Sequence, residues 1–268
     1  MPEGHTVHRT ANDFNRLFAG KALQVQSPQG RFAESAKLVS GTELVEAKAI
    51  GKQMFLRFQN ELTIRIHLGI YGKWNYHEFK SADEQIPEPF GQVRARFLNE
   101  VALADLRGPT VCEVITPDEV ALVERRLGPD PLNPNPRNVQ AERFIDRVKA
   151  SKTAIGLQLM NQDVIAGIGN VYRAELLFRA GISPHQPGES MTREQLQALW
   201  DDSVKLLKVG VATSFMITRD EFFKKNPTKA DRNFVYKREG LPCRSCGTNV
   251  IIELMAARKL YWCPGCQK

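Results

Sequence analysis

The chain has 268 residues, of which 42% are hydrophobic and 25% charged, and it carries 37 Lys and Arg against 30 Asp and Glu. This apolar fraction supports one large core or two smaller ones and excludes disorder as the main state of the chain. No stretch approaches the 18 consecutive apolar residues of a membrane-spanning helix, and the first ten residues lack the apolar segment of a secretory signal. We therefore expect a cytoplasmic protein with no membrane partner.

The first predicted element is a helix over residues 5–19, and Gly20 is a suitable residue to end it. Apolar side chains recur along this segment at the spacing of one helix face: Val7, Ala11, Phe14, Leu17 and Phe18. From about residue 22 to 116, short β-type runs such as LQVQS, QMFLRF and LTIRIHL alternate with turns rich in Gly, Pro, Asn and Asp. We expect residues 1–130 to form a β-sandwich or barrel-like lobe that begins with a helix.

A proline-rich stretch follows this lobe and contains Pro129, Pro131, Pro134 and Pro136. Because such a density of proline is incompatible with a helix or a central strand, we assign residues 131–138 to a linker. Residues 139–230 begin with helical patterns and become irregular and basic after residue 210. Residues 231–268 form the last segment and hold most of the cysteines.

The basic excess of the chain lies in its last quarter. Residues 203–268 hold 13 Lys and Arg against 5 Asp and Glu, whereas residues 1–130 hold 16 against 17 and residues 131–202 hold 8 of each. A local net charge of +8 attracts a phosphate-bearing partner. A solvated basic tail is the alternative interpretation.

Four of the five cysteines form two pairs, Cys243 with Cys246 and Cys263 with Cys266, and 16 residues separate the pairs. Each pair, with two residues between its members, directs two sulfurs toward one tetrahedral ion, so the spacing predicts a structural zinc site. Disulfides are the alternative, which a reducing compartment disfavours. The runs VIIEL and LYWC are expected to form a hairpin between the pairs. We interpret Cys112, in the apolar run VCEVI, as a buried core thiol.

Pro2 and Glu3 are candidates for covalent chemistry. Removal of Met1 would leave Pro2 as a secondary amine at the start of a helix, where the helix dipole favours the uncharged form. Such an amine can form an iminium with a sugar carbon, and the neighbouring Glu3 can act as an acid or a base. On these residues alone, an ordinary helix start with Pro and an acidic residue in the first turn is the simpler interpretation.

The segment AGIGNVYRAELLF at 166–178 predicts a break followed by a new helix at Asn170. Gly167 and Gly169 allow the turn, and the start of the helix would present free backbone N–H groups to a phosphate. The Asn170 side chain adds a further donor. A plain helical hairpin explains the pattern equally well.

A larger pattern emerges from motifs taken in order along the chain: MPEG at 1–4, GK at 51–52, HLGIYGKW at 67–74, LGPDPL at 127–132, NQDVIAGIGNVYRAELLFRAGISP at 161–184, VYKREGLPCRSCGT at 235–248 and RKLYWCPGCQ at 258–267. Together they resemble the formamidopyrimidine-DNA glycosylase/endonuclease VIII family of bifunctional DNA repair enzymes. The resemblance runs from the second residue almost to the last. The runs SPQGRF and DLRGPT, with LGPDPL, look most similar to the actinobacterial endonuclease VIII-like branch.

The resemblance implies catalytic roles for three residues. Pro2 matches the family's N-terminal proline nucleophile, and Glu3 matches the acid that assists opening of the deoxyribose. Lys52 matches a lysine on a β loop, near a phosphate of the damaged strand. A solvated loop lysine is the alternative for Lys52.

The resemblance also implies DNA contacts. Asn170, preceded by Gly169 in a helix–two-turn–helix motif, matches an asparagine that grips a backbone phosphate, and Arg258 matches the arginine of the zinc hairpin that does the same. Ile70 and Tyr71 occupy the segment from which family members fill the gap left by an extruded base. Surface positions for Asn170 and Arg258, and ordinary packing for Ile70 and Tyr71, are the alternatives.

The chain departs from the family's pattern in ways that bear on the elimination step and on substrate. Thr6 replaces a second glutamate found in many relatives, so any role of that carboxylate in elimination is absent or relocated. Arg107 in DLRGPT lacks the phenylalanine that follows in the purine-acting branch, and the segment after Gly210 lacks the glycine-rich lid of that branch. These last two departures favour oxidised pyrimidines over oxidised purines as substrates.

Taken together, the sequence predicts an α+β protein with two lobes: an N-terminal β-sandwich with an N-terminal helix, and a C-terminal helix–two-turn–helix lobe with a zinc-ribbon hairpin. The resemblance implies a monomeric bifunctional DNA glycosylase and AP lyase that binds damaged double-stranded DNA and one structural Zn²⁺. Action mainly on oxidised purines, a non-catalytic DNA-binding zinc protein, and an RNA-binding zinc ribbon are the alternatives.

Overall fold

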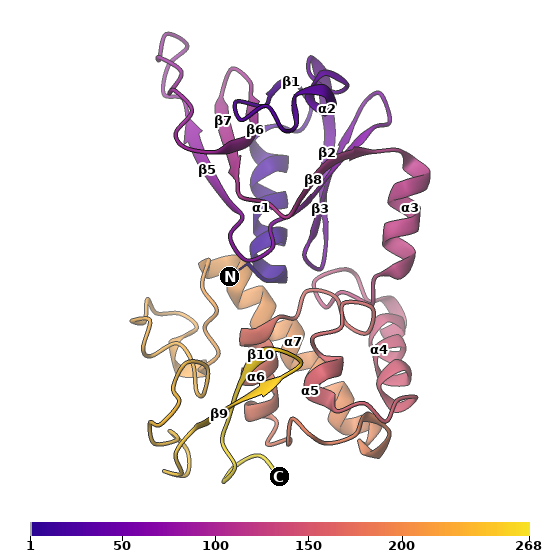
Figure 1. Cartoon of the computed structure of the whole chain (residues 1–268), viewed down its shortest axis with the longest axis vertical. Helices are drawn as coiled ribbons and strands as arrows, with labels where there is room; N and C mark the ends of the chain where they lie inside the picture. The colour runs from indigo at the N-terminus through magenta and orange to yellow at the C-terminus, as the bar shows by residue number, and fades with distance from the viewer. Residues whose placement is uncertain (1) are drawn as a thin grey trace. The chain divides into compact units, whose positions relative to one another are not determined.

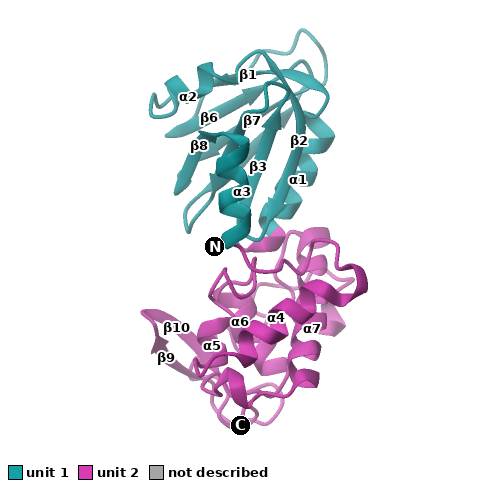
Figure 2. Ribbon diagram, turned by 90° about the vertical axis from the view of Figure 1, so that its right-hand side faces the viewer, with its two compact units in different colours: residues 1–2, 6–126 teal, residues 3–5, 127–268 magenta. Residues whose placement is uncertain are grey.

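Residues 2–268 are described by a computed structural model, in which the chain divides into two units (Figures 1 and 2). The first unit contains Pro2 and residues 6–126, and the second contains residues 3–5 and 127–268. The predicted removal of Met1 concerns a residue outside the described range. None of the helices within residues 2–268 is both long and apolar enough to cross a membrane.

The first unit is built on one antiparallel sheet of eight strands in the order β5-β7-β6-β1-β2-β3-β4-β8. The strands are β1 (Lys21–Gln26), β2 (Thr42–Ile50), β3 (Gln53–Phe58), β4 (Thr63–His67), β5 (Lys73–Glu78), β6 (Val93–Leu98), β7 (Ala102–Arg107) and β8 (Val111–Ile115). The first half of β1 pairs with β2 and its second half with β6, so this strand joins the two layers of a sandwich.

Helix α1 (Gly4–Leu17) buries the apolar stripe that the sequence predicted, including Val7, Phe14 and Phe18 at its end. These side chains pack in the core with residues of the strands, such as Phe58 and Phe97. Gly20 has a φ of +74° immediately after the helix, which a residue with a Cβ adopts at a cost. The predicted N-terminal helix and β-sandwich are confirmed.

Two helices of the first unit are not among the predicted elements: α2 (Ala33–Lys37) and α3 (Pro117–Arg126). A capping interaction starts α3, because the Glu119 carboxylate accepts from the backbone N–H of Thr116 at 2.8 Å. Acidic residues in its first turn and basic residues in its last turn also suit the helix dipole. The run TPDE at 116–119 carries this signal and was missed.

The second unit is helical and ends in a hairpin. Its elements are η1 (Pro136–Asn138), α4 (Val139–Lys149), α5 (Ile155–Gln158), α6 (Asn170–Arg179), η2 (Gly188–Ser190), α7 (Arg193–Thr213), η3 (Asp220–Phe222), β9 (Ile251–Met255) and β10 (Arg258–Trp262). Residues of α6 from Asn170 to Phe178 are all buried. Helix α6 is therefore the central element of this unit, and its core partners include Phe144 and Trp200.

The C-terminal hairpin shares a smaller core with α6. Ala174 and Phe178 of α6 pack with Val250, Tyr261 and the cysteine-bearing turns. In the hairpin, Arg258 lies opposite Met255 and Trp262 opposite Ile251. The predicted α+β class, with a helical C-terminal lobe and a ribbon hairpin, is confirmed. The chain changes unit between Arg126 and Leu127, and the four-segment functional division stays a prediction.

Candidate active site and nucleic-acid interface

Glu3 is the predicted site residue with the most complete set of contacts. Its side chain is fully buried, and its carboxylate accepts hydrogen bonds from the backbone N–H groups of Gly169 at 2.8 Å, Val171 at 2.9 Å and Tyr172 at 3.4 Å. The first N–H groups of a helix have no partner within it, and the positive end of the helix dipole favours an anion. Glu3 thus caps α6 from the other end of the sequence.

This contact corrects one expectation. The sequence predicted that the N–H groups at the start of α6 are free to hold a phosphate, whereas three of these N–H groups are donated to Glu3. The reason is that a carboxylate of the chain itself satisfies them.

The glycines of the AGIG turn let the N-terminus approach closely. A Cβ on Gly169 would lie 2.5 Å from Cδ of Glu3, and a Cβ on Gly4 would lie 2.8 Å from Cα of Gly167. The backbone N–H of Gly4 donates to the Gly167 carbonyl at 2.8 Å. Larger residues at these positions would separate Glu3 from α6.

Aromatic groups close this region against water. His5 and Tyr172 are both buried, and their rings meet edge to face with centroids 5.4 Å apart. Burial, together with the negative charge of Glu3, raises the pKa of Tyr172 well above its usual range. Because Glu3 is itself fully buried, its charge is screened less than it would be in water.

Asn170 links α6 to the hairpin. Its Nδ2 donates to the Lys259 carbonyl at 2.8 Å, and its Oδ1 accepts from Nη2 of Arg173. Lys259 directly follows Arg258, whose side chain is exposed at the start of β10. The structure therefore brings Glu3, Gly169, Asn170 and Arg258 together around the start of α6.

The remaining predicted catalytic and DNA-binding residues lie in the first unit. Pro2 is half-buried and separated from α1 by Glu3, and Lys52 is half-buried in the turn between β2 and β3. Gln53 pairs with His67, so Lys52 lies next to the end of β4. Burial and the charges of Lys52 and Arg65 lower the pKa of His67. Sequence reasoning assigned no role to His67.

Ile70 and Tyr71 lie in the turn between β4 and β5 and are 55% and 83% exposed. The turn is closed by a hydrogen bond from the N–H of Gly72 to the Leu68 carbonyl at 2.9 Å. This exposure excludes ordinary core packing for the two side chains. Their insertion into DNA stays a prediction.

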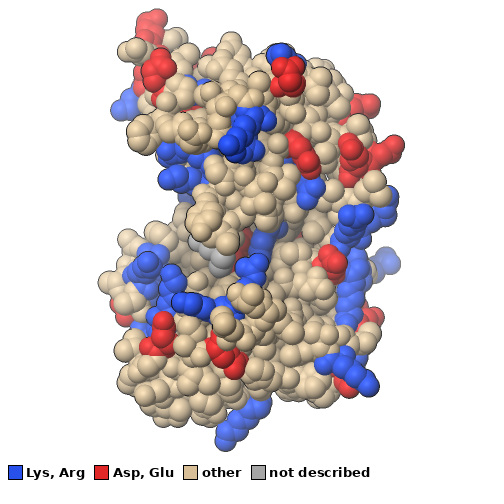
Figure 3. Space-filling view, viewed as in Figure 1, with Lys and Arg blue, Asp and Glu red and all other residues tan. Residues whose placement is uncertain are grey.

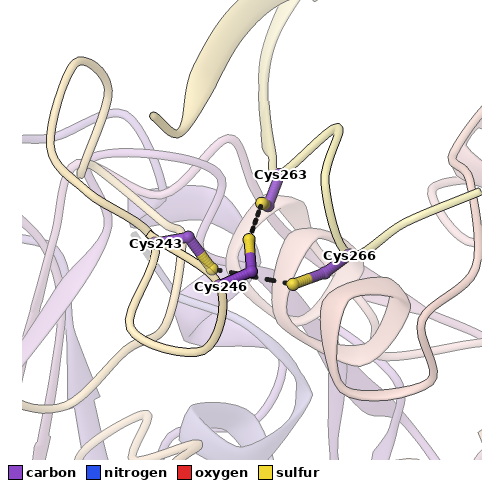
Figure 4. A group of neighbouring side chains, drawn as sticks. All are labelled: Cys243, Cys246, Cys263 and Cys266. Carbon is purple, nitrogen blue, oxygen red and sulfur yellow. Dashed lines mark hydrogen bonds between the residues drawn. The ribbon is translucent and has the colours of Figure 1, made fainter. Parts of the chain in front are cut away.

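The four predicted cysteine ligands converge (Figure 4). Their sulfurs lie within 4.8 Å of one another, with 3.8 Å between Cys243 and Cys266 and 3.5 Å between Cys246 and Cys263. These separations exceed the ~2.05 Å of a disulfide and approach the ~3.8 Å edge of a tetrahedron with metal–sulfur bonds of ~2.3 Å. Hydrogen bonds from Thr248 lower the pKa of Cys246 to about 6, whereas burial raises the pKa of Cys263 and of Cys266. The cluster fits one metal ion.

Cys112 lies outside the cluster, partly buried on β8 and packed against the core of the first unit. Its burial raises the pKa of the thiol to about 12, so it is protonated at neutral pH.

Comparison with known proteins places this geometry in a family. The profile of the formamidopyrimidine-DNA glycosylase N-terminal domain matches residues 1–112, and that of the formamidopyrimidine-DNA glycosylase H2TH domain matches residues 127–221. Endonuclease 8 1 of Mycobacterium tuberculosis is 44% identical over the whole length of both chains, and endonuclease 8 of Escherichia coli is 28% identical over the whole length of both. The chain belongs to the formamidopyrimidine-DNA glycosylase/endonuclease VIII family.

Solved structures agree with this assignment. The MutM (Fpg) protein of Thermus thermophilus has a TM-score of 0.77 at 27% identity, covering 99% of this chain and 98% of that one. The Lactococcus lactis Fpg in complex with DNA containing an abasic site has a TM-score of 0.79 at 18% identity, covering 99% of both chains, and supports the fold.

Two buried charged residues of α6, Glu175 and Arg173, were not singled out from the sequence. The Glu175 carboxylate accepts from the Thr218 hydroxyl and from the backbone N–H groups of residues 234–236 at 2.7–2.8 Å. Arg173 is 1% exposed and donates to Asn170 and to the Lys259 carbonyl. Charged residues inside the largely apolar run NVYRAELLF were the available signal, because a buried charge requires partners.

We expect Glu3→Gln to lower the free energy of unfolding by about 1–3 kcal/mol, because an amide N–H group would face backbone N–H donors. Urea unfolding measures this change. Glu189→Gln, at an exposed position, is the matched control and should differ from the parent chain by less than about 0.5 kcal/mol. Equal stability of Glu3→Gln and the parent chain would contradict the capping role of Glu3.

Proposed function

We propose that this chain is a bifunctional DNA glycosylase and AP lyase of base excision repair, acting on damaged double-stranded DNA in the cytoplasm. The observation that carries the proposal is the fully buried Glu3 carboxylate, held by three backbone N–H groups directly after Pro2. Membership of the family supports the assignment of both residues to the reaction.

Pro2 supplies the nucleophile once Met1 is removed. Its nitrogen attacks C1′ of the damaged nucleotide, the C1′–N bond to the base breaks, and the departing base takes up the proton that the proline nitrogen loses. The C1′–O4′ bond then breaks, O4′ takes up a proton from water, and the lone pair of the proline nitrogen forms the C1′=N double bond. The resulting iminium carries a positive charge at C1′ and acidifies the protons on C2′. Loss of a C2′ proton expels the 3′ phosphate, and a second elimination expels the 5′ phosphate.

The surroundings of Glu3 suit the ionised carboxylate. Three backbone N–H groups donate to its oxygens, and an ionised carboxylate is a better acceptor for them than a protonated one. A fixed negative charge next to Pro2 in the chain stabilises a cationic iminium without rearrangement during the reaction. Lys52 contributes a positive charge for a phosphate of the damaged strand.

The remaining site residues bind the phosphates of the DNA backbone or occupy the space that the extruded base leaves in the base stack. Asn170, whose side chain also hydrogen-bonds the Lys259 carbonyl and Tyr236, is assigned to a backbone phosphate by its match to the family's asparagine. Arg258 adds a guanidinium next to Lys259 in the chain. Figure 3 shows further Lys and Arg side chains on the second unit, over the segment between α7 and β9. Ile70 and Tyr71 take the place of the extruded base.

Zinc is the metal that best matches four thiolates at tetrahedral spacing. The cysteine cluster would hold one Zn²⁺ that fixes the hairpin and thereby the position of Arg258. The zinc ion has a structural role in this proposal.

Oxidised pyrimidines are the proposed substrates. Arg107 without a following phenylalanine, and the lack of a glycine-rich segment after Gly210, support this choice.

Borohydride reduction with a duplex that contains an abasic site should trap a covalent complex between the chain and DNA. Pro2→Gly should reduce the trapped fraction by about tenfold or more, because it replaces the secondary amine that forms the iminium. A chain extended by two residues before Pro2 should form no complex, because the proline nitrogen is then an amide. Trapping by the extended chain at the parent's level would contradict the mechanism, whereas DNA binding without any trapping would favour the non-catalytic alternative.

The purified chain should contain one zinc ion, measured by plasma mass spectrometry. Cys266→Ser should lose most of the metal, because it removes one of the four converging sulfurs, and Cys112→Ser should keep it. Full zinc content in Cys266→Ser would contradict the four-cysteine site.

A cleavage panel tests the substrate class. Duplexes with dihydrouracil or thymine glycol should be cut about tenfold faster than a duplex with 8-oxoguanine under single-turnover conditions. An abasic duplex serves as the positive control for lyase activity. Faster cutting of 8-oxoguanine would reverse the proposed preference without affecting the proline mechanism.

A further inference from the structure

Phe90 is exposed without an evident structural reason. It lies in the segment between β5 and β6, and its side chain is 80% exposed. Tyr71 and Phe90 are the two most exposed aromatic side chains within residues 2–268. An aromatic ring exposed to water lacks the favourable free energy of burying its apolar surface. Such an exposed ring is typical of a binding surface.

The backbone around Phe90 is held in place. Nη1 of Arg96 donates to the Pro87 carbonyl at 2.8 Å, and Arg96 itself forms a buried, bidentate ion pair with Asp105. Gly91 follows Phe90 with a φ of +72°, which favours glycine. The exposure of Phe90 therefore belongs to an anchored turn.

Arg107 supports the Phe90 ring. Its Nη1 donates to the Phe90 carbonyl at 3.2 Å, its Nη2 donates to Oδ1 of Asn75 at 2.6 Å, and its guanidinium carbon lies 5.6 Å from the ring centroid. This distance falls within the range of a cation–π contact. Arg107 lacks an aromatic residue directly after it in sequence, and the fold supplies one from another turn.

The Phe90–Arg107 pair is continuous with the turn that carries Ile70 and Tyr71. Arg107 pairs with Lys73 across β5 and β7, so the end of β7 lies where β5 begins. Gly108 lies against the Tyr71 carbonyl, since a Cβ on this glycine would be 3.4 Å from that oxygen. The two exposed aromatic rings thus belong to the same end of the sheet.

We propose that Phe90 is a second base-stacking residue, which binds a nucleobase of the lesion-bearing duplex on its open surface while Arg107 supports the ring. The inference rests on the proposed function, because it assumes that Ile70 and Tyr71 meet the DNA at this end of the sheet. An aromatic ring stacks on any base, and a guanidinium beside it adds attraction to the nearby phosphates.

The test measures the dissociation constant of a duplex with an uncleavable tetrahydrofuran abasic analogue. Phe90→Ala should weaken binding by about tenfold, the typical loss when one base stack is removed. Phe90→Trp should keep affinity within about twofold, because indole also stacks on a base. Leu38→Ala is the matched control, an exposed apolar residue at the end of α2 that should bind like the parent chain.

Two further readouts separate stacking from charge and from misfolding. The slope of log Kd against log salt should be the same for Phe90→Ala and the parent, because no charge is removed. A 2-aminopurine placed opposite the lesion or beside it should change its fluorescence on binding, and the position whose change is lost in Phe90→Ala identifies the stacked base. Thermal melting checks that each variant is folded.

Equal affinity of Phe90→Ala and Leu38→Ala, or loss of affinity in Phe90→Trp as large as in Phe90→Ala, would overturn the inference. If the parent chain traps an abasic duplex with borohydride while Phe90→Ala binds normally, the inference alone fails. If the parent chain forms no trapped complex, the proposed function fails first.

Discussion

The hydrogen bonds between the Glu3 carboxylate and the start of α6 are the constraint on which the rest of the structure depends. They join the third residue to a helix start 166 residues further along the chain. They are possible because Gly167 and Gly169 let the two backbones approach closely. The same contact satisfies N–H groups that a buried helix start would otherwise leave unpaired, and it fixes a negative charge next to Pro2. Stability and the proposed chemistry therefore rely on one carboxylate.

Helix α6 connects the Glu3 contact to the hairpin that carries the proposed DNA-binding residue Arg258. Asn170 and Arg173 contact the carbonyl of Lys259 in β10, and Glu175 holds the chain at residues 234–236 before the cysteine cluster. Glu175, like Glu3, is bonded to N–H and hydroxyl donors of the surrounding chain. Such directional contacts set the position of the hairpin more closely than apolar packing alone. These hydrogen bonds, and the metal that the cysteines are proposed to hold, determine the position of Arg258.

Local patterns predicted much of the fold, and contacts distant in sequence account for what was missed. The helical stripe of Val7 and Phe14, the alternating strands and the cysteine spacing each carry their signal within a few residues. The N–H groups at Asn170 were misjudged because their partner, Glu3, lies at the other end of the sequence. Helix α3 was missed although the run TPDE has the residues of a helix N-terminus. The pairing of Phe90 with Arg107 appears only once β5, β6 and β7 are placed side by side, because the two residues lie 17 positions apart.

The central claim is that the nitrogen of Pro2 is the atom that bonds to the sugar. Its most direct test is peptide mapping of the borohydride-trapped complex by mass spectrometry after digestion with trypsin and nuclease. The account predicts that the sugar remnant is attached to the peptide of residues 2–9, at its N-terminal proline and without Met1. Attachment to a peptide that contains Lys52, the amine proposed to contact a phosphate, would contradict the account.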